Sequence, residues 1–136
     1  MRHLFEKLRH GTVTLLLRIS LRSVNIVPVM EIKNLINATT RQEFREWLTA
    51  NAATASECWL PVKKGKLPQD GVVQYIDAVE EALCFGWIDS TCKTVEGQVV
   101  QRFSPRKKDS NWTELNKERC RRLIKLGLMT EPGHNG

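Results

Sequence analysis

Residues 75–106 read YIDAVEEALCFGWIDSTCKTVEGQVVQRFSPR, and this stretch decides the fold. Apolar side chains in its first part recur every three or four residues, which is the spacing of one helix face. They are Tyr75, Ile76, Val79, Ala82 and Leu83. We therefore expect a helix over residues 74–85 that turns these side chains inward and leaves Asp77, Glu80 and Glu81 facing solvent.

The second part of the same stretch predicts a β-hairpin. Gly86 follows the helix, in the position where a glycine commonly ends one. Residues 87–95 and 98–103 both have the pattern of strands, and Glu96-Gly97 between them is typical of a tight turn. A helix that leads into a hairpin is thus the centre of the predicted fold.

Further elements are expected on either side of this centre. The sequence TRQE at 40–43 is a capping box, which predicts a helix over about 40–50. Residues 57–62 alternate as a strand does, and Pro61 favours a place at the sheet edge. A third helix is expected over 112–126, with four side chains inward: Leu115, Cys120, Leu123 and Ile124. The sequence therefore predicts an α+β fold, in which a small antiparallel sheet of one edge strand plus a hairpin is packed by three helices.

The chain changes character at Met30. Residues 1–29 carry five basic side chains against Glu6 alone, and this segment supplies most of the formal net charge of +6. We expect it to be an extra basic segment outside the domain; a targeting or membrane-surface segment and a first element of the fold are the open alternatives. Residues 30–136 are expected to form a single domain. Thr130-Glu131-Pro132 has the pattern of a helix start, so we expect C-terminal helices that this sequence lacks.

Composition argues against several kinds of protein and site. Arg18 and Arg22 interrupt the most apolar N-terminal run, so we expect no transmembrane segment. The four cysteines form no CxxC pair and the three histidines lie near the chain ends, which argues against a zinc site. Residues 30–133 contain no histidine, the commonest general base near neutral pH. We therefore expect no metal, no other cofactor and no catalytic set of the Ser–His–Asp or Cys–His type.

Five residues around the hairpin form the candidate ligand-binding site. They are Trp87, Asp89, Arg102, Arg106 and Trp112. A turn at 96–97 brings Asp89 opposite the end of the second strand, near Arg102 and Arg106. Such an acid–arginine pair flanked by two tryptophans is either a structural ion pair, which hairpins commonly use, or half of a pocket in which a surplus arginine binds a carboxylate or phosphate.

The C-terminal third of the chain is basic. Between positions 102 and 125 nine basic residues stand against three acidic ones, with Phe103 and Trp112 among them. Basic and aromatic residues combined in this way also bind single-stranded nucleic acid, by charge and by stacking. Most charged helix faces are simply solvated, however, so nucleic-acid binding is the least favoured hypothesis.

Four uncommon sequence motifs follow one another along the chain. They are AVEEALCFGWIDS at 78–90, QRFSPR at 101–106, SNWTELNKER at 110–119 and GLMT at 127–130. Together they resemble the YdeI/OmpD-associated family, also described as bacteriocin-protection proteins, over roughly residues 39–133. The resemblance implies a bacterial-type cytosolic protein linked to envelope stress and to tolerance of antimicrobial peptides or bacteriocins, with no established catalytic residues. Family members continue past the final helix start and have no counterpart to residues 1–29.

From these observations we predict a non-catalytic, cytoplasmic protein that binds an unknown protein partner or a small anionic ligand. The first alternative is an enzyme of unknown reaction that uses Asp89 with Arg102 and Arg106. The second is a weak nucleic-acid-binding module. We assign no catalytic residue.

Overall fold

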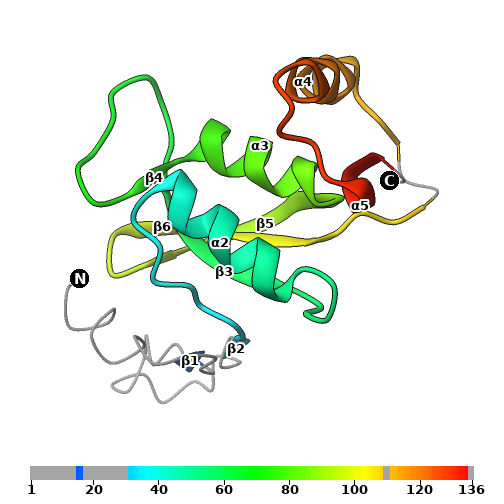
Figure 1. Cartoon of the computed structure of the whole chain (residues 1–136). Helices are drawn as coiled ribbons and strands as arrows, with labels where there is room; N and C mark the ends of the chain where they lie inside the picture. Colours follow the sequence, from blue (N-terminus) through cyan, green and yellow to red (C-terminus); the bar gives the residue numbers. More distant parts are fainter. Residues whose placement is uncertain (1–14, 17–30, 109–110, 135–136) are drawn as a thin grey trace.

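The computed structural model describes residues 15–16, 31–108 and 111–134 (Figure 1). The expected extra segment 1–29 lies outside the described residues except for a two-residue strand, β1 (Leu15–Leu16). This strand pairs antiparallel with β2 (Glu31–Ile32) to form a small separate sheet.

Between residues 41 and 134 the predicted helices and strands follow one another in the predicted order, together with one further strand, at 73–74, that was not predicted. They are α2 (Arg41–Asn51), β3 (Cys58–Lys63), β4 (Val73–Gln74), α3 (Tyr75–Cys84), β5 (Trp87–Val95), β6 (Gln98–Pro105), α4 (Glu114–Lys125) and α5 (Glu131–His134). The predicted α+β class is confirmed. The prediction used three local signals: a helix cap, a turn dipeptide and a helix-ending glycine. In the structure each of them lies where a helix or strand begins or ends.

The main sheet is mixed rather than purely antiparallel. Its strand order is β4-β3-β6-β5; β6 runs antiparallel to both of its neighbours, whereas β4 runs parallel to β3. β3, the strand predicted for the edge, is bordered by β4 over its last two residues, Val62 and Lys63. Earlier on the same side, Trp59 bonds to Asn34 and Ile36 at 3.0 and 2.8 Å. Pro61 lies between these two partners, where its missing N–H interrupts neither of them.

The β5–β6 hairpin forms around Glu96-Gly97, as predicted. Both residues have positive φ, 50° and 81°, which is the left-handed backbone that a tight hairpin turn requires. The strand register shifts between Asp89 and Cys92, where β5 bulges. The buried side-chain amide of Gln101 donates to the carbonyls of the two residues between them, at 3.1 and 3.0 Å. This amide satisfies backbone groups that the bulge takes out of the ladder.

Helices α2 and α3 cover one face of the main sheet (Figure 1). The larger core lies between them and the sheet, and Phe44 of α2 packs on Phe103 of β6 with ring centroids 5.3 Å apart. The opposite face carries a smaller cluster made of Ile32, Leu35, Trp59, Val95 and Val100. Alternation along the strands thus divides the sheet residues between two separate apolar clusters.

The face predicted for helix α3 is partly wrong. Glu80 and Glu81 are only 7% and 4% exposed, whereas Ile76 is 41% exposed. The neighbouring helix explains the difference, because α2 presents Arg41 and Arg45 to the two buried carboxylates. The spacing of apolar residues within one helix cannot show that a glutamate has an arginine partner on another helix.

The face predicted for helix α4 is also partly wrong. Leu123 is fully buried and Cys120 half-buried, as expected, but Leu115 and Ile124 are 60% and 46% exposed. Leu123 is the one residue of this helix that is fully buried. α4 therefore lies against α3 along a narrow stripe, and most of its residues are exposed.

The helix start predicted at Thr130-Glu131-Pro132 is confirmed by the short helix α5. The backbone N–H of Thr130 donates to the carbonyl of Cys84 at the end of α3, at 3.0 Å. Gly133 packs so tightly here that a Cβ atom would stand 2.8 Å from the carbonyl carbon of Cys84. The chain after α4 is therefore fixed against the C-terminal end of α3.

Candidate functional site

Trp87, the first of the five candidate residues, is part of the main core. Its side chain is 1% exposed, and its indole ring meets Trp47 edge-on with centroids 5.9 Å apart. Its ring N–H donates to the carbonyl of Ala52 at 3.3 Å. Trp87 therefore joins α2 to β5 and has no surface to offer a ligand.

Asp89 lies on the helix-covered side of the sheet, beside the start of α3. Its carboxylate accepts a hydrogen bond from the hydroxyl of Tyr75. Burial, together with this carboxylate, raises the pKa of Tyr75 to about 12. Tyr75 therefore stays protonated as a donor over the physiological range, and Asp89 is engaged by it.

Arg102 lies on the other side of the sheet. It neighbours Phe103, which faces the main core, and alternation along β6 sends the two side chains to opposite faces. Its guanidinium pairs with Glu57 at 3.2 Å and donates to the hydroxyls of Ser90 and Ser104 at 3.0 and 3.3 Å. The ion pair expected with Asp89 across the hairpin is thus replaced by a pair with Glu57. This residue directly precedes β3, the strand next to β6.

Arg106 and Trp112 are the two candidates that the structure brings together. The guanidinium carbon of Arg106 lies 3.9 Å from the centre of the Trp112 ring, which is a close cation–π contact. The backbone N–H of Arg106 is bonded to the carbonyl of Gly86 at 2.8 Å, so the residue is held at the end of the hairpin. Trp112 itself is half-buried and packs against the main core.

Trp112 also lines an open groove of about 320 Å³ between α4 and the chain around α5. We call it the α4 groove; its lining is Trp112, Lys117, Cys120, Arg121, Ile124, Met129, Gly133 and His134. The uncharged side chains among these form an apolar surface, and Lys117, Arg121 and His134 bring polar N–H donors to it. An apolar surface with a few convergent polar groups is the usual composition of a ligand-binding site.

The two cations of the α4 groove are only loosely engaged within the protein. Lys117 pairs with Glu114 at 3.0 Å and Arg121 pairs with Glu118 at 2.9 Å, one helix turn away in each case. These carboxylate side chains are 81% and 70% exposed. Solvent-exposed pairs of this kind contribute about 0–1 kcal/mol each, so a bound anion can compete for either cation.

Cys120 belongs to the apolar part of the α4 groove. Burial raises the pKa of its thiol, and nearby Arg106 offsets only part of that effect. The thiol is therefore neutral at physiological pH and acts as a small apolar group, not as a nucleophile.

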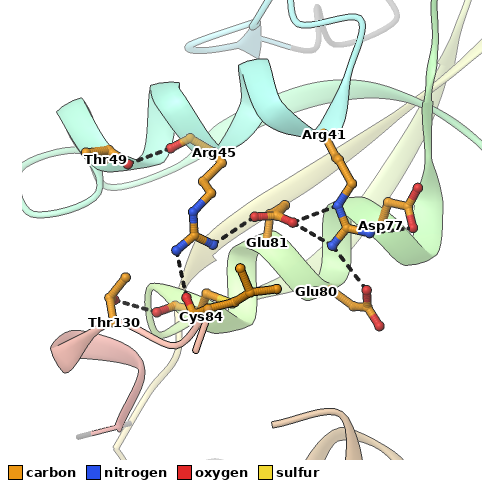
Figure 2. A network of polar contacts seen from close by, with 9 residues as sticks. Arg41, Arg45, Thr49, Asp77, Glu80, Glu81, Cys84 and Thr130 are labelled. Atoms are coloured by element: carbon orange, nitrogen blue, oxygen red, sulfur yellow. Dashed lines mark hydrogen bonds and ion pairs between the residues drawn. The ribbon is translucent and has the colours of Figure 1, made fainter. Parts of the chain in front are cut away.

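A second polar cluster lies between helices and is structural. Figure 2 shows Arg41 and Arg45 of α2 reaching the carboxylate of Glu81 on α3. Arg45 also donates to the carbonyl of Leu128 at 2.7 Å, and Arg122 of α4 pairs with Glu80. These contacts tie α2, α3, α4 and the segment before α5 together, and we call them the helix network.

Sequence reasoning found part of this geometry and missed part of it. It recognised Arg106 and Trp112, and it noted that the C-terminal third is basic. It did not find Met129 or His134, because they reach the groove through the packing of α5 on α3, which is a long-range contact. The helix start at 130–132 was the signal that this segment is ordered.

Among the residues that the structure describes, no group of three or more His, Cys, Asp and Glu side chains is arranged to hold a metal. Within the same ranges, no helix combines the length and the apolar character needed to cross a bilayer.

Comparison with known proteins matches the chain to a family model. A family model described as "Domain of unknown function (DUF8412)" matches residues 36–136. No curated protein and no solved structure matches the chain.

Proposed function

The chain belongs to the DUF8412 family, a domain of unknown function, and from the chemistry of its own residues we propose that it binds an anionic ligand in the α4 groove without catalysing a reaction. The observation that carries this proposal is the arrangement of Lys117, Arg121 and His134 around an apolar surface that includes Trp112. Hydrogen bonds from charged donors to a carboxylate or phosphate are the strong ones, roughly twice as strong as neutral pairs.

The Arg106–Trp112 stack supports binding in a second way. It fixes one face of the indole ring, so the part of the ring that lines the groove is held in place before a ligand arrives. Side chains that are already ordered lose less entropy when a ligand binds. The stack thus makes the groove a partly pre-formed site.

The proposed cellular role follows from the resemblance to bacteriocin-protection proteins: a cytoplasmic protein that acts in envelope stress or in tolerance of antimicrobial peptides. Antimicrobial peptides carry many Lys and Arg residues. Lys117 and Arg121 line the α4 groove, so direct sequestration of such peptides in it is opposed by charge. Protection would therefore work through an anionic ligand or partner.

The enzyme alternative has less support from the geometry. Asp89 accepts a hydrogen bond from Tyr75, and the raised pKa keeps that tyrosine protonated. Arg102 lies on the opposite face of the sheet and pairs with Glu57. The three groups that this alternative required are therefore not assembled around one reacting centre.

A titration with inorganic phosphate and with citrate tests the proposal. Either anion is added to the ¹⁵N-labelled protein, and backbone amide shifts in two-dimensional NMR spectra report the site. We expect the shifted amides to cluster at Trp112, Lys117, Arg121 and His134. Lys117→Gln should weaken binding about fivefold, because it removes one charge-assisted contact worth about 1 kcal/mol.

Lys125→Gln is the matched control for that variant. Lys125 lies on the same helix and carries the same charge, but it does not line the α4 groove. If both variants weakened binding equally, the anion would be responding to the overall charge of α4. If no anion shifted the amides of the groove, the proposal would be wrong.

A further inference from the structure

The α4 groove is elongated along its helix. Lys117, Arg121 and Ile124 line it, and the first and last of them are seven helical steps apart, or about 10 Å at 1.5 Å per residue. Met129 and His134, from the segment after α4, line it as well. A length of about 10 Å matches three residues of extended polypeptide.

Apolar and cationic groups are separated within the α4 groove. Ile124, Met129 and the neutral Cys120 are aliphatic or sulfur-bearing, and methionine adapts its shape to the side chain it meets. Lys117 and Arg121 lie one helix turn apart and offer two positive charges in addition to this surface. An occupant that satisfies both parts needs an aliphatic group and two separate negative charges.

We infer that the α4 groove binds an extended acidic peptide segment of a partner protein, with an aliphatic side chain on the apolar surface and a carboxylate for each of Lys117 and Arg121. The inference rests on the proposed function and specifies the ligand of that same site. The charges match one for one, because two carboxylates replace the exposed Glu114 and Glu118 as partners of the two cations.

The lining of the α4 groove favours a peptide over a nucleic acid. Proteins that bind single-stranded nucleic acid stack successive bases on aromatic side chains. Trp112 is the one Trp, Tyr or Phe in the lining, and Arg106 already covers one face of its ring. The aliphatic and sulfur-bearing side chains of the groove suit an aliphatic side chain of a peptide instead.

The test uses three acetylated and amidated tripeptides in the same NMR titration of the full chain. Glu-Leu-Glu carries both features, Gln-Leu-Gln lacks the charges, and Glu-Gly-Glu lacks the aliphatic side chain. We expect Glu-Leu-Glu to shift the amides of the α4 groove and to bind at least about fivefold more tightly than either of the others.

Two protein variants supply the matched comparison. Ile124→Ala removes an apolar side chain of the groove, and Leu126→Ala removes one that does not line it; both side chains are exposed, at 46% and 58%. We expect Ile124→Ala to weaken the binding of Glu-Leu-Glu about threefold or more. Leu126→Ala should leave that affinity unchanged.

The outcomes separate this inference from the proposed function. If phosphate or citrate bound in the α4 groove while the three peptides bound equally, the inference of a peptide ligand would be wrong. The proposed binding of anions would remain supported. If a hexathymidylate strand bound more tightly than Glu-Leu-Glu, with an affinity that fell steeply with salt, the groove would be a nucleic-acid site and the inference overturned. If no anion bound there, both proposals would fail.

Discussion

The arginine–glutamate pairs of the helix network and those of α4 differ in their exposure to solvent. In the helix network, the side chain of Glu81 is 5% exposed and meets both Arg41 and Arg45 (Figure 2). On α4, the side chain of Glu118 is 70% exposed and pairs with Arg121. The residue types are the same in both places, and the distances between nitrogen and carboxylate oxygen are similar, at 2.5–3.0 Å. The two carboxylates differ in how far they are exposed to solvent.

This difference separates charges that hold the fold from charges that remain available. A buried carboxylate has lost its water, so it depends on its partners, and removing either side leaves an uncompensated group. An exposed pair exchanges readily with solvent and salt. The helix network is therefore structural, whereas the cations of the α4 groove can exchange their carboxylate partners for a bound ligand.

The largest expected effect comes from Glu81→Gln. The substitution keeps the size of the side chain and removes the charge that Arg41 and Arg45 share. We expect the free energy of unfolding to fall by about 2 kcal/mol, less than for a fully buried pair because both arginines are partly exposed. Urea denaturation followed by circular dichroism measures the change. A loss below about 0.5 kcal/mol would mean that the network does not hold α2 and α3 together.

An intermediate effect is expected from Tyr75 at high pH. Its pKa in the folded protein is about 12 against an ordinary value of 10, so the stability it contributes is present below pH 10 and is lost as the pH rises toward 12. Tyr75→Phe removes this contribution and keeps the ring. We expect the stability difference between the two proteins to shrink by about 1 kcal/mol over that range, after allowance for solvent screening. A constant difference from pH 8 to 12 would show that the Tyr75–Asp89 bond does not couple to folding.

Short-range signals explain why most of the elements could be predicted. Thr40 caps α2 by accepting from the N–H of Glu43 at 3.1 Å, as the capping box requires. Gly86 follows α3 with φ at +76°, and Glu96-Gly97 makes the hairpin turn. Each of these features depends on residues within four positions of one another, so the sequence contains the whole cause.

Long-range partners explain what could not be predicted. Glu80 and Glu81 turn inward because arginines from another helix meet them there. Arg102 turns away from Asp89 because strand alternation places it beside Glu57. The α4 groove has the same origin, since three of its lining residues, Met129, Gly133 and His134, reach it only when the segment after α4 packs on α3. Each outcome is decided by a contact between segments that are distant along the chain.

The smallest expected effect on stability comes from Glu118→Gln, the counterpart of Glu81→Gln on α4. We expect the free energy of unfolding to change by less than about 0.5 kcal/mol, because the pair with Arg121 is exposed. The same substitution removes the carboxylate that competes for Arg121, so phosphate should bind in the α4 groove about twofold more tightly. Urea denaturation and the NMR titration measure the two quantities on one sample. If this variant lost as much stability as Glu81→Gln, the exposed pair would be holding α4 in place, and its arginine would not be available to a ligand.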